Sequence, residues 1–300
     1  MSFNTRRRLI WNAARASYYP KARRINIDRL IANSERDASI CAADHLVVAK
    51  GLIDEALHAL IQLQRIRVKR FRAKDDIHNP AFWSLVDHQV HLLLAIRRLT
   101  LVGLDNIARG LARSLFETTD LAVAVLFDND LASRYWSDDQ YDEEEFWRAN
   151  LSNGRAPRRA KAAMKLLGAS TEETEECFKV RKEAKKLFSG TIHSSQFAAM
   201  SSTATLSLSS PGLFAIRNLG HISAYAPQLC GALAGEIHFF LSFVVKSIIS
   251  KVPINFLSDL HKDEVLPFIM SALVLQECFA EFAEDLDNQT QLIIDKAAGA

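Results

Sequence analysis

The sequence predicts an all-α protein, a single bundle of long antiparallel helices that follows a basic N-terminal arm. Three observations support this prediction: apolar residues recur at steps of three and four, helix-capping residues stand at the ends of these segments, and strand-like alternation is nearly absent. The chain has 300 residues, of which 49% are hydrophobic, which is enough for a large core. We divide it into an arm over 1–24 and one bundle domain over 25–300.

The first helix is expected to run from Asn33 or Ser34 to about residue 73. Its apolar stripe consists of Ala42, Leu46, Ala49, Ile53, Ala56, Leu60 and Leu63. The alternating segment 65–72 resembles a strand, but it directly continues this stripe. We therefore predict helix there as well.

Two further helices follow. The second is expected to begin at Asn79-Pro80, because proline suits the first helical turn, and to extend to about Val102. The third is expected to be capped by Asp105 and to extend to about Phe127.

The middle of the chain predicts a short helix over 138–153 and a longer one over 171–189. Acidic residues fill the first turns of the short helix, where they suit the helix dipole and do not indicate a metal site. The longer helix has the clearest ends. Ser170 and Glu173 form a capping box before it, and Gly190 follows it.

The C-terminal third begins with the hydroxyl-rich run Ser201–Ser210, which is expected to be a mobile loop or linker. Helices are expected at 213–222, 227–250 and 263–287.

The formal net charge is only +2, so the chain as a whole does not indicate a nucleic-acid or membrane partner. Lysine and arginine are nevertheless clustered in three segments: Arg6, Arg7, Arg8, Arg15, Lys21, Arg23 and Arg24; Arg65, Arg67, Lys69, Arg70, Arg72 and Lys74; and Arg155, Arg158, Arg159, Lys161 and Lys165. These side chains either neutralise phosphates or form solvated helix faces and a flexible arm.

Other features predict a cytoplasmic protein without a membrane segment. The four cysteines lie far apart, as expected of reduced thiols, and the N-terminus lacks the apolar core of a secretory signal. The most apolar stretch, 227–249, contains Glu236, His238 and Lys246, which a bilayer would tolerate poorly. We therefore interpret it as a buried core helix.

Glu55 and His58 have the spacing of a di-metal bundle ligand pair. No second Glu-x-x-His pair is present, although Asp87, His88 and His91 are available. We therefore predict no metal and no cofactor, and a di-metal bundle is the most distant of our hypotheses.

Arg109, Arg113 and Glu117 recur at four-residue steps and so share one face of the third helix. That helix is otherwise apolar, so we expect Glu117 to be at least partly buried and bonded to Arg113 or to a group near His193. The stripe is either a structural salt bridge or part of a substrate-binding site.

Two histidines could take part in catalysis. His193 follows a predicted helix end, and His221 ends the sequence Arg217-Asn218-Leu219-Gly220-His221. An arginine and a histidine close together can bind a phosphodiester and move a proton. Alternatively, each histidine is a hydrogen-bonded core or cap residue.

The segments Arg109-Gly-Leu-Ala-Arg113-Ser-Leu-Phe-Glu117 and Phe188-Ser-Gly-Thr-Ile-His193-Ser-Ser resemble those of helical proteins related to the HEPN superfamily. In these proteins an arginine-rich helix pairs with a later helix end that carries a serine and a histidine. The resemblance covers about residues 100–250.

This resemblance implies an all-α bundle, a homodimer, and a role in RNA cleavage, toxin–antitoxin pairs or phage defence. Nuclease members carry Arg, a polar residue, three to five further residues and His. In this chain Arg217 and Asn218 begin that motif, but only two residues separate Asn218 from His221. The resemblance thus implies Arg217, His221 and His193 as catalytic candidates, with Arg109, Arg113, Glu117 and Asn218 as substrate-binding candidates.

Two functional hypotheses lead. The chain is an RNA-binding or metal-independent RNA-cleaving effector of a prokaryotic defence or toxin–antitoxin system, with a composite site across a dimer. Alternatively, it is a non-catalytic helical module that binds a protein partner.

Overall fold

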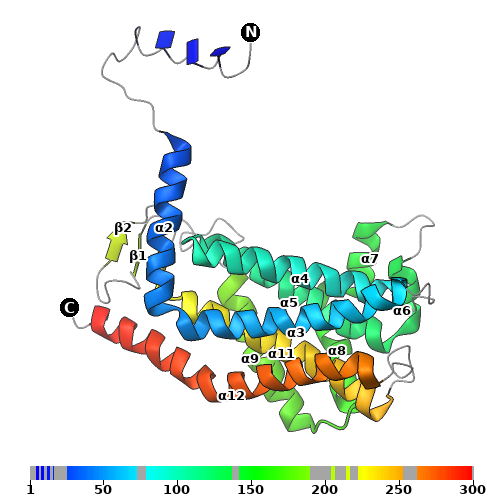
Figure 1. Ribbon diagram of the computed structural model, residues 1–300. Helices are drawn as coiled ribbons and strands as arrows, with labels where there is room; N and C mark the ends of the chain where they lie inside the picture. Colours follow the sequence, from blue (N-terminus) through cyan, green and yellow to red (C-terminus); the bar gives the residue numbers. More distant parts are fainter. Residues whose placement is uncertain are drawn as a thin grey trace.

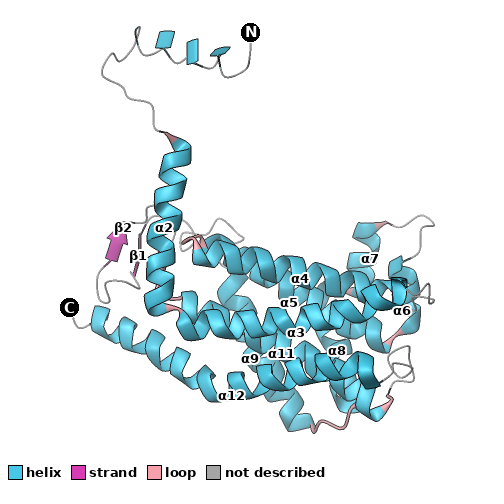
Figure 2. Ribbon diagram, viewed as in Figure 1, coloured by secondary structure: helices cyan, strands magenta, loops and turns pink. Residues whose placement is uncertain are grey.

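The computed structural model describes residues 26–72, 79–136, 142–189, 204–206, 214–216, 222–252 and 262–298, and a few residues among the first sixteen. Most of the described chain is helical, which confirms the prediction of an all-α bundle (Figures 1 and 2). The described residues before Asn26 are helical and exposed. The division into a basic arm and one domain stays a prediction.

The described helices differ widely in length. They are α2 (Ile27–His45), α3 (Val47–Arg72), α4 (Pro80–Leu101), α5 (Asp105–Phe127), α6 (Asn129–Trp136), α7 (Glu143–Asn150), the 3-10 turn η1 (Ser152–Gly154), α8 (Arg155–Leu166), α9 (Thr171–Ser189), α11 (Ala226–Ser250) and α12 (Lys262–Ala298). Helices α3, α4, α5, α11 and α12 form the body of the bundle, and α8 and α9 pack on α5 (Figure 1).

The core lies between these helices. Its largest fully buried side chains include Phe82, Phe116, Phe188, Phe240 and Phe268. Apolar burial of this extent is the main source of stability for a helical bundle, because the helices contribute little on their own.

The long first helix predicted from 33 to 73 is in fact two helices. The chain turns at Leu46 (φ −114°, ψ 18°), and α2 departs from the direction of α3 (Figure 1). The Leu46 side chain is buried in the core. No glycine or proline marks the turn, and the apolar stripe passes through it unbroken, so periodicity alone could not reveal the break.

Two of the predicted helix starts are confirmed by their hydrogen bonds, and a third is shifted by one residue. Asn79 adopts the left-handed conformation, and its Oδ1 accepts a hydrogen bond from Phe82 N at 2.9 Å, as an N-cap should. The Ser170–Glu173 capping box is also confirmed, with bonds of 3.1 and 2.7 Å. Asp105, however, is the first residue of α5 and not its cap, which is Leu104.

The least accurate predictions concern the segment before α11. Ala204–Leu206 (β1) lies within the predicted serine-rich loop, and it pairs antiparallel with Phe214–Ile216 (β2). The helix predicted over 213–222 is therefore wrong at least at 214–216. The last helix continues past residue 287 to Ala298.

Two of the described helices have the length and composition of membrane-spanning segments. Ala226–Ser250 has a mean hydropathy of 1.6 with 50% of its most apolar window buried, and Asp263–Phe282 has 1.5 with 28% buried. Core helices of folded domains share these properties, so the finding alone assigns no location. The expectation of a cytoplasmic protein without a membrane segment stays a prediction.

Candidate functional site

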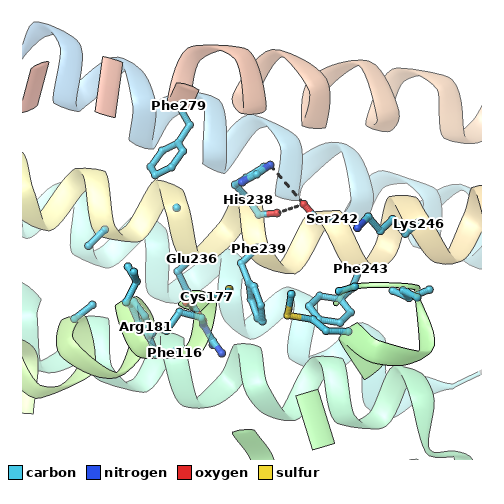
Figure 3. A pocket seen from close by; sticks show the side chains of 17 residues that line it. Phe116, Cys177, Arg181, Glu236, His238, Phe239, Ser242, Phe243, Lys246 and Phe279 are labelled. Atoms are coloured by element: carbon cyan, nitrogen blue, oxygen red, sulfur yellow. Dashed lines mark hydrogen bonds and ion pairs between the residues drawn. The ribbon is translucent and has the colours of Figure 1, made fainter. Parts of the chain in front are cut away.

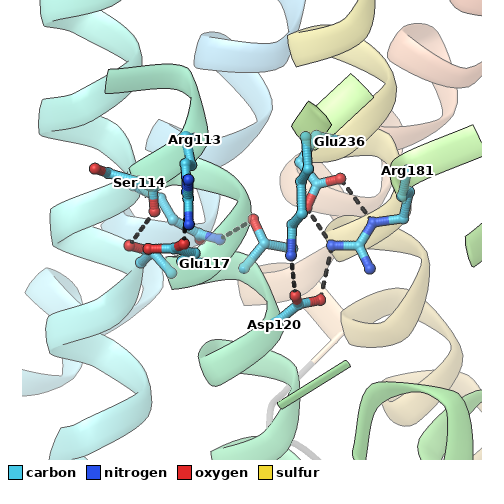
Figure 4. Close-up of polar contacts among 10 residues, drawn as sticks. Arg113, Ser114, Glu117, Asp120, Arg181 and Glu236 are labelled. Carbon is cyan, nitrogen blue, oxygen red and sulfur yellow. Dashed lines mark hydrogen bonds and ion pairs between the residues drawn. The ribbon is translucent and has the colours of Figure 1, made fainter. Parts of the chain in front are cut away.

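Helices α5, α9 and α11 bring polar and charged side chains together in two clusters (Figure 4). The surface cluster consists of Arg113, Glu117 and Ser189. The buried cluster consists of Asp120, Arg181, Lys185 and Glu236. Both clusters use the same face of α5, because Glu117 and Asp120 are separated by less than one helical turn.

The predicted stripe on α5 does not share one environment. Arg109 is buried, Arg113 is partly exposed and the Glu117 side chain is 56% exposed. The bond predicted between Arg113 and Glu117 is present, with Nε to Oε1 at 3.0 Å. The expected burial of Glu117 is wrong, because this part of the stripe lies at the edge of the bundle.

Arg109 lies in the interior with Asp105. Its Nη2 is 3.9 Å from Asp105 Oδ2, and its guanidinium stacks 5.2 Å from the centroid of the Tyr225 ring. The hydroxyl of Ser223 donates to Asp105 Oδ2 at 2.5 Å. This contact ties the start of α5 to the chain before α11, which suits a structural role for the pair.

The surface cluster joins the two segments that resemble HEPN-related proteins. Arg113 Nη1 donates to Ser189 Oγ at 3.1 Å, and Ser189 Oγ donates to the Lys185 carbonyl at 2.6 Å. Below these polar contacts, the rings of Phe116 and Phe188 meet edge to face at 5.8 Å. The end of α9 is therefore held against the middle of α5 by one polar and one aromatic contact.

The buried cluster has Arg181 at its centre. Arg181 Nε and Nη2 bind the two oxygens of Glu236 at 2.8 and 2.5 Å, and Nη2 also lies 2.8 Å from Asp120 Oδ1 (Figure 4). Lys185 binds the second oxygen of Asp120. Two cations thus face two carboxylates, so the formal charge of this cluster is balanced.

The electrostatics of this cluster follow from its burial. Burial would lower the pKa of the Arg181 guanidinium, but the charges of Glu236 and Asp120 outweigh burial and raise it. Burial raises the pKa of the Glu236 carboxyl, and the charge of Arg181 opposes that rise. Arg181 Nη1 has no hydrogen-bond acceptor among the described residues, but the guanidinium carbon stacks 3.9 Å from the centroid of Phe239.

A pocket of about 450 Å³ lies between α9, α11 and α12, with contributions from α5 and α8, and Arg181 and Glu236 of the buried cluster are part of its lining (Figure 3). Four phenylalanines form much of its wall: Phe116, Phe239, Phe243 and Phe279. A row of polar side chains on α11 completes it, consisting of His238, Ser242 and Lys246. Its volume falls within the range of small-molecule sites, about 300–1,000 Å³.

Four of the predicted site residues lie outside the described part of the chain. They are His193, Arg217, Asn218 and His221. The description stops at Ser189, four residues before His193, includes Ala204–Leu206 and Phe214–Ile216, and resumes at Ile222, directly after His221. Their assignment as catalytic or substrate-binding residues stays a prediction.

The metal hypothesis gains nothing from the geometry. His58 Nδ1 lies 3.9 Å from Glu55 Oε2 on an exposed face of α3. Within the described ranges, no group of three or more His, Cys, Asp or Glu side chains could hold a metal ion.

Some members of two of the basic clusters are paired within the fold. Arg67 binds Asp87 across α3 and α4. On α8, Lys161 binds Glu175 at 2.6 Å, and Arg159 Nη1 donates to the Asn150 carbonyl at 3.0 Å. For these residues of the second and third basic clusters, the contacts favour the interpretation of solvated, locally paired helix faces.

Sequence reasoning missed the buried cluster and the pocket. Glu236 was noticed only as an obstacle to a membrane span. A single acid in an apolar helix nevertheless implies a buried cationic partner, because an unpaired buried charge is very costly. That signal could have led to Arg181. Comparison with models of protein families, with curated proteins and with solved structures yields no match.

Proposed function

We propose that this chain is a HEPN-like RNA-binding protein that holds a phosphate of the RNA backbone at the surface cluster of Arg113, Glu117 and Ser189. The observation that carries the proposal is the contact between Arg113 and Ser189. It joins the two segments on which the family resemblance depends, and it leaves a partly exposed guanidinium at the surface. Arginine is well suited to phosphate because its planar fork can donate two parallel hydrogen bonds.

The surroundings of Arg113 support an anionic ligand. Lys182 and Lys186 on α9 are exposed, and both lie within two turns of Ser189. In the described part of the chain Arg113 Nη2 has no hydrogen-bond partner, while Nε and Nη1 hold Glu117 and Ser189. These two bonds fix the plane of the guanidinium before a ligand arrives.

In this proposal RNA cleavage depends on three residues outside the described part of the chain. His193 is one candidate base, with Arg113 as its phosphate ligand, and Arg217 with His221 is the pair that suits the superfamily motif. A homodimer would bring two copies of such a site together.

Binding of a labelled single-stranded RNA, measured by fluorescence anisotropy over a salt series, tests the proposal. Arg113→Gln should weaken binding and reduce the salt slope by roughly 0.7 units for one lost phosphate contact. Arg148→Gln is the matched control, because Arg148 forms the same type of exposed four-residue pair with Glu144 on α7. Equal losses in both variants would show general charge attraction and would contradict the proposed site.

Cleavage requires a separate assay with metal-free protein. The parent should cut RNA, and His193→Ala or His221→Ala should abolish cutting while leaving anisotropy binding unchanged. Binding without cleavage in the parent would leave an RNA-binding protein without nuclease activity.

The second candidate function is a helical module that binds a protein partner. It is favoured by the apolar side chains that α12 exposes, which are Leu266, Met270, Leu273 and Val274. Exposed apolar patches of this kind are typical of protein interfaces. Absence of RNA binding in the parent, together with loss of a co-purifying partner after Met270→Glu, would favour this function.

A further inference from the structure

The pocket between α9, α11 and α12 has an apolar end and a positively charged end. Three of its polar side chains, His238, Ser242 and Lys246, follow one another at four-residue steps and therefore form a row along α11 (Figure 3). The ion pair of Arg181 and Glu236 also lies in the wall of the pocket. Helix α11 is otherwise strongly apolar, with a mean hydropathy of 1.6 over its most apolar window. The row passes from the half-buried side chains of His238 and Ser242 to the exposed side chain of Lys246, so the pocket is polar along one side.

The apolar end of the pocket is closed by Phe279 of α12. A Cβ atom at Gly235 would lie 2.9 Å from the Phe279 ring, so only glycine allows the ring to approach the α11 backbone this closely. The Phe279 ring also stacks on His238, with centroids 6.0 Å apart and planes 24° apart. Burial lowers the pKa of His238, so the imidazole at this end is neutral near pH 7.

The opposite end of the pocket carries a positive charge. Lys246 is exposed and lies eight residues beyond His238 on the same face of α11. Within the described part of the chain no carboxylate forms an ion pair with it. Its charge does contribute to the lowered pKa of Glu173, although the hydrogen bonds from Ser170 contribute more.

The middle of the pocket offers one polar contact. Ser242 Oγ donates to the His238 carbonyl at 2.8 Å and lies 3.4 Å from His238 Nε2. The aromatic rings of Phe239 and Phe243 are also part of the pocket wall. From Gly235 to Lys246 the pocket spans about 16 Å of helix at 1.5 Å per residue. A volume of about 450 Å³ over that length makes it narrow.

We propose that this pocket binds an elongated amphiphile with an anionic end, such as a medium-chain carboxylate. The anionic group pairs with Lys246, and the apolar body lies along Phe243 and Phe239 toward Phe279. The site is independent of the proposed RNA-binding surface, because Arg113, Glu117 and Ser189 do not line it.

Displacement of the neutral fluorescent probe phenylnaphthylamine from the full chain tests this proposal. Decanoate, decanol and decylamine are the competitors, since they share one chain and differ only in the charge of the head group. Decanoate should bind most tightly. Lys246→Gln should weaken the binding of decanoate by about fivefold, which corresponds to the strength of an exposed ion pair. It should leave the binding of decanol unchanged.

Matched variants and a local probe complete the experiment. Lys165→Gln is the control, because Lys165 is an exposed lysine on α8 that does not line the pocket. Ala184→Phe should fill the pocket and prevent all three competitors from binding, with the circular dichroism melt confirming that it folds. Cys177 lines the pocket whereas Cys41 and Cys278 do not, so decanoate should slow alkylation of Cys177 alone.

Four outcomes would overturn the proposal. Failure of the parent to bind the probe or decanoate excludes an amphiphile site. Equal affinity for decanoate and decylamine, or an equal loss in Lys165→Gln, excludes charge recognition by Lys246. Alkylation of Cys177 that decanoate does not slow places the ligand elsewhere on the protein.

Discussion

Two of the Arg–Glu pairs in the described part of the chain show the same chemistry in different environments. Arg113 and Glu117 pair at the surface of α5, where the side chains are 32% and 56% exposed. Arg181 and Glu236 pair between α9 and α11, where the side chains are 8% and 0% exposed. Water screens the charges of the first pair and is excluded from the second. Loss of the buried pair should therefore reduce the free energy of unfolding much more than loss of the surface pair.

The buried pair should show the largest effect. Glu236→Ala leaves Arg181 without its bidentate partner inside the protein, and we expect the free energy of unfolding to fall by about 3–5 kcal/mol. Urea unfolding followed by circular dichroism measures this change. A loss below about 1 kcal/mol would mean that water reaches Arg181, and the contrast between the pairs would disappear.

The double variant Arg181→Met/Glu236→Leu sharpens the same test. Because it removes both charges and leaves apolar side chains in a largely apolar place, it should recover most of the lost stability. If it is as unstable as Glu236→Ala, the shape of the pair and not its charge is what the core requires.

Asp120 should have the next largest effect. It contacts both Arg181 and Lys185, but Arg181 would retain Glu236, and Lys185 is 24% exposed and can turn toward water. Asp120→Ala should therefore cost about 2 kcal/mol, the contribution of hydrogen bonds to charged groups. A cost as large as that of Glu236→Ala would show that the four charges act as one unit.

The two pairs also show what the sequence could and could not predict. Arg113 and Glu117 lie four residues apart on one helix, so their bond follows from helical spacing. Arg181 and Glu236 are 55 residues apart, and their contact depends on how α9 and α11 pack. Long-range contacts of this kind have no signature in spacing, although Glu236 in an apolar segment implies that some cation must reach it.

The fold was predictable for a similar reason. Capping residues and three- and four-residue periodicity are local, and they correctly located α4, α5, α9 and α11. The turn at Leu46 has no local signal, because its neighbours Ala42 and Ala49 continue the stripe on both sides. The pocket was not predictable either, since Phe279 and His238 meet only after α12 folds onto α11.

A smaller effect concerns the pH dependence of stability at His238. Burial lowers its pKa in the folded protein below the ordinary value of 6.5. The unfolded chain then binds the proton more readily, so stability should be constant above about pH 7 and fall as the pH decreases through 6.5. Urea unfolding midpoints over this range should fall less steeply in His238→Gln than in the parent. The exposed residue His58 provides the control, and an equal change in His58→Gln would remove His238 from the explanation.

The smallest effect is expected at Glu117. Its carboxylate accepts one hydrogen bond from Arg113 Nε at 3.0 Å, but more than half of the side chain is in contact with water. Water can replace that bond in Glu117→Ala, and Arg113 keeps its contact with Ser189. The free energy of unfolding should therefore change by less than about 1 kcal/mol, in contrast to Glu236→Ala. A double-mutant cycle of Glu117→Ala with Arg113→Ala isolates the pair, and its coupling should decrease further in high salt because exposed charges are screened. A coupling of several kcal/mol that resists salt would mean that Glu117 is covered in solution, by a second copy of the chain or by another segment, and the surface cluster would then be an interface and not an open phosphate site.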